Sequence, residues 1–137
     1  MLRSLGRVLG LVAMAIFVSG TFARAQQDVS VKLNPQNNSG ESGTATLSDI
    51  GGGKTKIVLA VSGQPANVGQ PVHVHKGNCA QLDPAPAYGL TTLTDGKSET
   101  VIDVPISTLQ KEQFAVNGHK SATEASTYVF CGNIPPQ

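Results

Sequence analysis

The sequence predicts an all-β domain, a Greek-key sandwich or flattened barrel of seven or eight short strands. Apolar and polar residues alternate with a period of two in several segments. Clusters of glycine, proline, asparagine and aspartate interrupt these segments at short intervals. No window carries a sustained apolar stripe at helical spacing. Short strands separated by so many turns are typical of sandwiches and barrels.

Residues 1–25 are predicted to be a cleaved secretory signal peptide that precedes the domain. Two arginines form a basic start, an apolar run covers residues 8–18, and the sequence ARA at residues 23–25 fits a signal peptidase site. The apolar run is about half of the roughly 20 residues that a membrane-spanning helix needs. We therefore expect residues 26–137 to be secreted or periplasmic, with no membrane span after cleavage.

The charge of the remaining chain argues against a nucleic-acid partner. All three arginines lie within residues 1–25, which leaves seven lysines against nine acidic residues and a formal charge of −2. A nucleic-acid-binding surface needs a basic patch, and this chain has too few cations to build one. The roughly 112 residues after the signal segment are enough for one domain with one core.

Three strands are predicted in the first half of the domain. Apolar residues alternate in residues 28–34, and two further β-rich runs cover residues 42–50 and 54–63. Three glycines separate the second run from the third and can adopt the positive φ that a tight connection needs. We expect a hairpin there, followed by a loop over residues 64–71.

The next strand is expected to carry His73 and His75. Residues 76–89 follow it and contain two prolines without any periodicity, so we predict a long ordered loop held by Cys79. Asp95-Gly96 then lies between two β-rich runs within residues 90–105, which is a strong hairpin signal. The remaining expected elements are one helical turn within residues 106–113 and strands over residues 114–120 and 127–134.

Cys79 and Cys131 are the two cysteines of the chain. In an oxidising compartment an even number of cysteines in a small domain favours a disulfide. Such a bond would close a loop of about 50 residues and stabilise the fold by about 4 kcal/mol in the chain-entropy model. The alternatives are free thiols or a thiolate that binds a metal.

His73 and His75 are one residue apart, so on a strand both imidazoles project from the same face. His119, the third histidine of the chain, lies on a later predicted strand that could pair beside them. Three neutral imidazole nitrogens suit copper or zinc, and copper is bound more tightly in the usual divalent series. The alternative is a strand whose histidine face is simply wet.

Four short motifs resemble ordered landmarks of the Cu,Zn superoxide dismutase family. They are HVH at residues 73–75, GNC at 77–79, GHK at 118–120 and CGNI at 131–134. The resemblance implies a Greek-key β-sandwich of the superoxide dismutase type and one copper ion held by His73, His75 and His119. It also implies a disulfide between Cys79 and Cys131.

The chain departs from the family at several positions. All three histidines are used by the copper set, so the family's histidine-bridged zinc site cannot form. Tyr128 occupies the position where the active enzymes have the arginine that guides superoxide. Lys76 and Lys120 each follow a predicted ligand and could replace part of that charge. Gly118, in place of a bulky apolar residue, leaves the direction of His119 open.

Asp83 and Asp103 are the other acidic residues considered as metal ligands. Asp83 lies beside proline in a predicted loop, where aspartate is more often a turn residue. Asp103 follows a β-rich run and reads as a solvent-facing residue. Neither is assigned a metal role.

Three functions are compatible with these patterns. The first is a secreted superoxide dismutase-like protein that binds copper through three histidines without efficient catalysis. The second is a copper-only superoxide dismutase, whose substrate would be superoxide. The third is an envelope or interaction module in which the metal site has decayed.

Overall fold

The predicted all-β fold is confirmed by the structure, a computed structural model that describes residue 20 and residues 26–137. The predicted signal segment, residues 1–25, lies outside the described residues except for Gly20. Eight strands and one short helix form. They are β1 (Val29–Pro35), β2 (Ser42–Asp49), β3 (Thr55–Ser62), β4 (Val72–Asn78), β5 (Gln81–Gly89), β6 (Lys97–Ile102), α1 (Ile106–Lys111), β7 (Phe114–His119) and β8 (Tyr128–Asn133). Within the described part of the chain, no helix has the length and apolar character needed to cross a bilayer.

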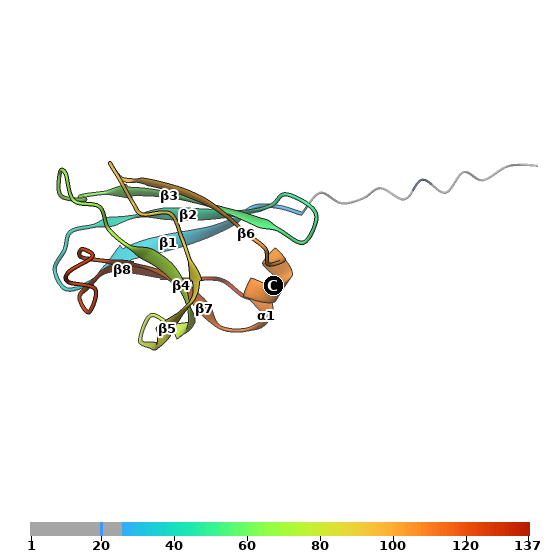
Figure 1. The fold of residues 1–137 in the computed structure, drawn as a ribbon. Helices are drawn as coiled ribbons and strands as arrows, with labels where there is room; N and C mark the ends of the chain where they lie inside the picture. Colours follow the sequence, from blue (N-terminus) through green and yellow to red (C-terminus); the bar gives the residue numbers. More distant parts are fainter. Residues whose placement is uncertain (1–19, 21–25) are drawn as a thin grey trace, which may run out of the picture.

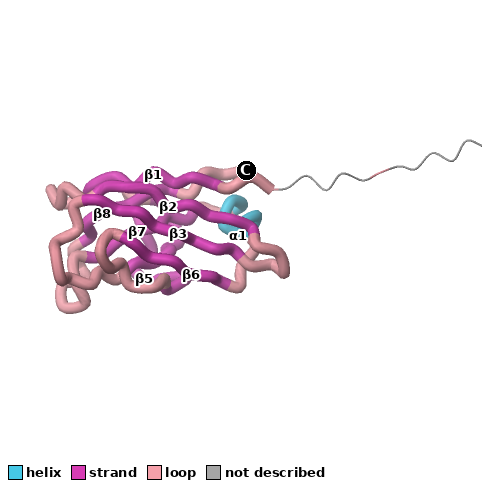
Figure 2. Tube along the Cα trace, turned by 90° about the horizontal axis from the view of Figure 1, so that it is seen from above, coloured by secondary structure: helices cyan, strands magenta, loops and turns pink. Residues whose placement is uncertain are grey.

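All eight strands belong to one antiparallel sheet in the order β5-β4-β7-β8-β1-β2-β3-β6. The sheet curls so that one half, β5, β4, β7 and β8, faces the other half, β1, β2, β3 and β6 (Figures 1 and 2). β1 joins the halves because it pairs with β2 along most of its length and with β8 at Asn34 and Pro35. The chain crosses between the halves after β3, β5 and β6, which is the non-sequential connectivity expected of a Greek key.

The hydrophobic core fills the space between the two halves. Strand alternation directs one apolar face of each half inward, and burial of each such side chain contributes about 1.5 to 3 kcal/mol. The fully buried apolar side chains include Leu33, Leu47, Ile57, Leu59, Val72, Val74, Val116 and Phe130. Since the valines of β4 and β7 point inward, the alternate residues of these two strands must point to the opposite face. That outward face carries the histidines.

Both predicted tight turns adopt the expected backbone. The three glycines between β2 and β3 have φ values of 82°, 64° and 71°. Asp95 and Gly96 also have positive φ, 49° and 74° respectively. The predicted helical turn within residues 106–113 is present as α1, at one end of the sandwich (Figure 1).

The hairpin predicted within residues 90–105 is only half correct. Its second arm forms β6, which pairs with β3, but its first arm forms no regular strand. Leu93 makes a single bridge to Gln70, and the Thr91 amide donates to the Thr100 hydroxyl at 2.7 Å. Backbone pairing between the two arms is limited to Thr94 and Lys97, which exchange two hydrogen bonds of 3.0 Å around the Asp95-Gly96 turn.

The long loop predicted for residues 76–89 is wrong, because β5 occupies most of it. β5 pairs with β4 and lies at the edge of the sheet, where proline is tolerated since one side of the strand needs no ladder hydrogen bonds. Pro86 pairs with His75, and the register shifts on either side of His75. The prolines therefore mark an irregular edge strand and not a loop.

Glu41 and Gln70 form a buried polar pair near the start of β2. Glu41 is 2% exposed and Gln70 is fully buried. The Gln70 amide Nε2 donates to Oε1 of Glu41 at 2.8 Å, while Oε2 of Glu41 and Oε1 of Gln70 have no partner. Burial raises the pKa of Glu41, and the hydrogen bond from Gln70 opposes this only in part. A neutral acid suits this position, because its hydroxyl is a donor beside a glutamine whose oxygen has no partner among the described residues.

Replacing Glu41 with glutamine is expected to stabilise the protein at pH 7 by about 1 kcal/mol, because glutamine avoids the cost of either ionising the buried carboxyl group or keeping it protonated at that pH. The folded-state pKa of Glu41 lies above its unfolded value, so wild-type stability is lost as pH rises through the folded pKa. The gain from Glu41→Gln should therefore be small at pH 4 and largest at pH 7. Urea denaturation at both pH values measures it.

The matched control is Glu99→Gln, because Glu99 is exposed on β6. This change should leave stability unaltered at both pH values. A Glu41→Gln variant that is less stable than the wild type at pH 7 would show that the ionised carboxylate is the stable form.

Candidate metal centre

The three predicted ligands meet on the outward face of β4 and β7. His73 and His75 lie on β4, and His119 ends β7. The two strands are antiparallel with Val74 opposite Val116, which places the end of β7 beside the start of β4. One nitrogen from each imidazole lies within 4.8 Å of the others. The structure thus brings together all three sequence-predicted site residues.

The cluster is largely shielded from solvent. His75 is fully buried, His119 is 6% exposed, and His73 is half-buried. The ring centroids of His73 and His119 are 4.8 Å apart, and those of His73 and His75 are 5.6 Å apart. The alternative of a simply wet histidine face does not describe these side chains.

Backbone carbonyls fix the orientation of two of the rings. Nδ1 of His75 donates to the Asp83 carbonyl at 2.7 Å, and Nδ1 of His119 donates to the Ala125 carbonyl at 2.5 Å. A neutral imidazole carries one N–H, so Nε2 of both rings is left as a lone pair. In metal-binding histidines, such a hydrogen bond from the ring nitrogen that does not bind the metal normally selects the tautomer.

His73 is oriented by His119. Its Nδ1 lies 2.8 Å from Nε2 of His119. Because the N–H of His119 is already bonded to Ala125, His73 must be the donor in this pair. Nδ1 of His73 could serve as the third nitrogen ligand of a metal ion once the ring had changed to the tautomer that carries its proton on Nε2.

Burial favours the neutral form of His73 and His119. Desolvation lowers the pKa of His73, and the neighbouring His119 and His75 lower it further. Desolvation also lowers the pKa of His119, opposed by the hydrogen bond to Ala125. Both rings are therefore neutral at pH 7, and a metal need not displace bound protons from an imidazolium.

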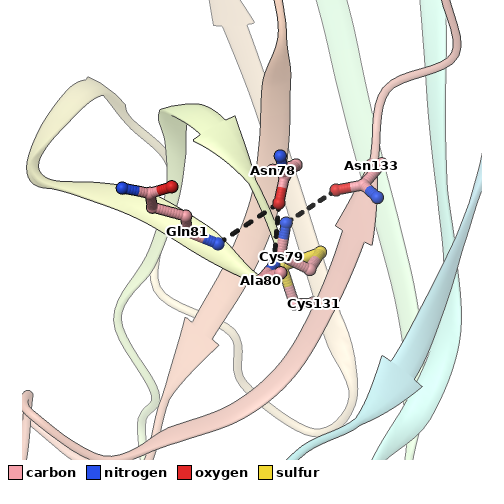
Figure 3. Close-up of a disulfide and its surroundings, with 6 residues drawn as sticks. All are labelled: Asn78, Cys79, Ala80, Gln81, Cys131 and Asn133. Atoms are coloured by element: carbon pink, nitrogen blue, oxygen red, sulfur yellow. Dashed lines mark hydrogen bonds between the residues drawn. A yellow bond between two sulfur atoms is a disulfide. The ribbon is translucent and has the colours of Figure 1, made fainter.

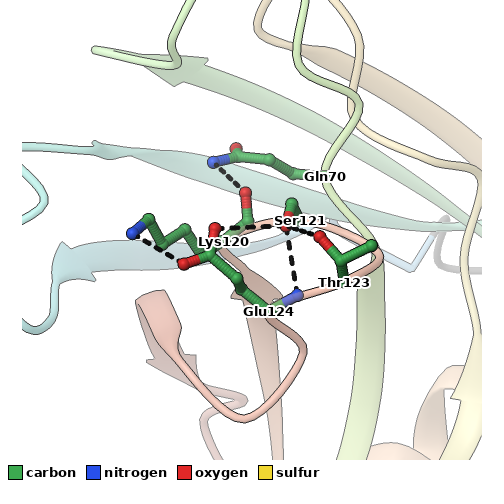
Figure 4. Close-up of polar contacts among 5 residues, drawn as sticks. All are labelled: Gln70, Lys120, Ser121, Thr123 and Glu124. Carbon is green, nitrogen blue, oxygen red and sulfur yellow. Dashed lines mark hydrogen bonds and ion pairs between the residues drawn. The ribbon is translucent and has the colours of Figure 1, made fainter.

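The loop of residues 120–127 follows His119 and is held by polar contacts, several of which Figure 4 shows. The amide of Lys120 donates to the Thr127 carbonyl at 2.8 Å and closes the loop at its base. Within it, the Glu124 amide donates to the Ser121 hydroxyl at 3.1 Å. The Gln70 amide reaches the Lys120 carbonyl at 3.4 Å from outside the loop. These contacts position the Ala125 carbonyl that orients His119.

The predicted disulfide between Cys79 and Cys131 is present (Figure 3). It connects the turn between β4 and β5 to the middle of β8, with 5.8 Å between the Cα atoms. The Cys79 amide also donates to the side chain of Asn133 at 2.8 Å. The bond therefore anchors the start of β5, the strand whose Asp83 carbonyl orients His75.

Gly118 has a packing role that explains its place before His119. A β-bulge lies between the two residues. The ring of Phe130 lies against Gly118, and a Cβ atom there would come within 2.4 Å of it. The close approach expected of a strand glycine is therefore found, and His119 points into the cluster.

Charged groups around the cluster are paired elsewhere. Lys76 is 3.7 Å from Glu112, and Lys120 is 3.0 Å from Glu124. Tyr128 packs edge-on against His119, with 5.1 Å between ring centroids. The position that resembles the family's arginine thus holds a neutral aromatic ring over the histidines.

The two aspartates behave as turn and surface residues. The Asp83 carboxylate accepts from the Ala85 amide at 2.9 Å, which is a turn contact, and Asp103 forms an exposed ion pair with Lys54. Asp83 contributes to the candidate site through its backbone carbonyl, which orients His75. Sequence reasoning missed the carbonyls of Asp83 and Ala125, and no sequence signal identifies them because every residue carries one.

Replacing both cysteines with serine is expected to cost about 4 kcal/mol of stability, from the entropy of the released loop. It should also free β5 and loosen the bond between His75 and the Asp83 carbonyl. Chemical denaturation measures the first effect, and the ¹⁵N shifts of the His75 ring report the second. A single, unchanged Nδ1–H tautomer in the double variant would show that β5 stays in place without the disulfide.

Comparison of the chain with protein-family models, with curated proteins and with solved structures gave no match. The functional interpretation of the cluster accordingly rests on its geometry and on the four sequence motifs.

Proposed function

We propose that the protein is exported and binds one copper ion through His73, His75 and His119, without efficient catalysis. The observation that carries the proposal is Nε2 of His75. This atom is buried and has no hydrogen-bond partner among the described residues. An orphaned buried nitrogen is costly to leave unpaired, and a metal ion held jointly with His73 and His119 would satisfy it.

Copper is proposed as the metal because neutral imidazole nitrogens bind it more tightly than zinc in the usual divalent series. The 2.8 Å between Nδ1 of His73 and Nε2 of His119 is a hydrogen-bond distance in the metal-free cluster, and metal binding would replace that hydrogen bond.

Export and kinship with the superoxide dismutases are parts of the same proposal. The disulfide between Cys79 and Cys131 suits an oxidising compartment and agrees with the predicted signal segment. The motifs around the histidines and cysteines support the kinship, and the curled antiparallel sheet is compatible with it.

The surroundings of the cluster argue for holding copper and against fast dismutation. A bound copper ion would supply one-electron redox chemistry. Rapid use of superoxide also requires positive charge that attracts the anion. Lys76 and Lys120 are engaged with Glu112 and Glu124, and Tyr128 supplies no cation.

Titration of the purified protein with Cu(II) is expected to give one bound ion per chain and a spectrum with hyperfine structure from three nitrogens. His75→Ala or His119→Ala should weaken binding by more than about 100-fold, since loss of mere outer-shell partners already costs 10- to 100-fold. Calorimetry and electron paramagnetic resonance measure both effects.

The control for this titration is Lys120→Ala, which alters an exposed side chain next to a ligand and should leave affinity unchanged. Equal copper affinity in the wild type and in His119→Ala would contradict the proposed site. Absence of binding in the wild type would favour the interaction module with a decayed site.

Superoxide consumption by the copper-loaded protein is expected to be close to that of a His73→Ala, His75→Ala double variant treated in the same way. The reason is that, in the described part of the chain, no free cation near the cluster attracts the superoxide anion. Pulse radiolysis at low and high salt measures the rate of consumption. Fast consumption that falls steeply with added salt would instead support the copper-only dismutase.

A further inference from the structure

Asn117 is a fully buried residue in the middle of β7 whose side chain has no hydrogen-bond partner. Its exposed fraction is 0%, and both Oδ1 and Nδ2 are buried and unpaired among the described residues. Most buried amides in proteins are hydrogen-bonded, and each unmade bond costs about 1 to 3 kcal/mol. The two unpaired atoms therefore suggest that a further group, which is not part of the polypeptide, binds to the side chain of Asn117.

The sheet register places Asn117 at the floor of the histidine cluster. It lies opposite His73 on β4 and opposite Cys131 on β8. Directly opposed residues of antiparallel strands have Cβ atoms about 5 Å apart and point to the same face. His119 is two residues further along β7, and His75 is the diagonal neighbour on β4. All three proposed ligands thus surround Asn117.

The neighbouring side chains cannot satisfy this amide. The N–H groups of His75 and His119 donate to the Asp83 and Ala125 carbonyls, and Nδ1 of His73 is engaged with His119. Cys131 is in the disulfide, whose sulfurs are weak acceptors. The polar atoms of these neighbours that remain in the cluster are the nitrogens proposed to bind copper.

We propose that Asn117 is a positioning residue that hydrogen-bonds a water molecule held by the metal in the coordination position left free by the three histidines. The proposal rests on the proposed copper site. Nδ2 donates to the oxygen of that water molecule, and Oδ1 accepts one of its protons. Asn117 thereby decides which small oxygen ligand the metal retains.

A water molecule bound by the protein alone fits this position less well. Buried waters make about three hydrogen bonds on average, and the groups around Asn117 are committed to one another. The metal supplies the missing bond. A neutral amide donor, with Lys76 and Lys120 paired elsewhere, also favours neutral water over an anion at this position.

The test compares the wild type with Asn117→Val, which removes the polar atoms and retains a side chain suited to a strand. Without copper, the variant is expected to be at least as stable as the wild type, because an unpaired amide is replaced by an apolar group. With copper, its affinity for Cu(II) should be about 10- to 100-fold lower, as for other outer-shell partners. Thermal denaturation and calorimetry measure the two effects.

Thr55→Val is the matched control, because Thr55 is also fully buried and is bonded to the Val104 carbonyl at 2.7 Å in the other half of the sheet. It should reduce stability equally with and without copper. If Asn117→Val also lowers stability equally in both forms and leaves copper affinity unchanged, Asn117 binds an ordinary internal water and the proposal is overturned.

A second measurement reports the water molecule directly and does not depend on the variant folding. Electron nuclear double resonance of the Cu(II)-loaded wild type in H₂O and D₂O should reveal an exchangeable proton strongly coupled to copper. The coupling should persist in Asn117→Ser, which keeps a donor and an acceptor, and change in Asn117→Val. A wild-type copper site that shows only the weakly coupled exchangeable protons of the imidazole N–H groups would overturn the proposal.

The outcomes separate this inference from the function on which it rests. If the wild type binds no copper, the proposed function itself fails. If copper binds with three nitrogens while affinity and proton coupling are unaffected by Asn117→Val, the copper site stands and only the role of Asn117 fails.

Discussion

The antiparallel pairing of β4 with β7 is the constraint on which the candidate site depends. Val74 lies opposite Val116, both are fully buried, and their burial against the other half of the sheet holds the register. A slip of one residue would turn the valines outward and the histidines into the core. The apolar face thus determines where His73 and His119 meet, although they are 46 residues apart in the chain.

Two further segments cover the histidines and fix the orientation of their rings. β5, anchored by the disulfide, brings the Asp83 carbonyl to His75, and the loop of residues 120–127 brings the Ala125 carbonyl to His119. They shield a sheet face that would otherwise be wet. This shielding lowers the pKa of His73 and His119, and the same contacts direct the Nε2 lone pairs of His75 and His119 into the cluster. Orientation and desolvation therefore have one structural origin.

Among the described residues, the side chains around the candidate site supply no free positive charge. Tyr128 packs an aromatic ring against His119, the lysines beside the predicted ligands pair with glutamates, and Asn117 contributes a buried amide. A site with these neighbours suits a metal that is retained with a water molecule better than one that collects an anion. These neighbours support the proposal that the three histidines hold a metal ion without fast catalysis.

The sequence by itself determined the alternation that makes strands, the turns at positive φ and the side chains able to bind a metal, because these depend on local residue type. It misled at β5, where prolines suggested a loop, since an edge position that tolerates proline exists only within a sheet. Tertiary structure alone decided which nitrogen of each imidazole faces the cluster and that Asn117 lies beneath it. The physical reason is that backbone carbonyls and strand register select these orientations. Every residue has a carbonyl and any residue can occupy a register position, so residue type does not reveal them.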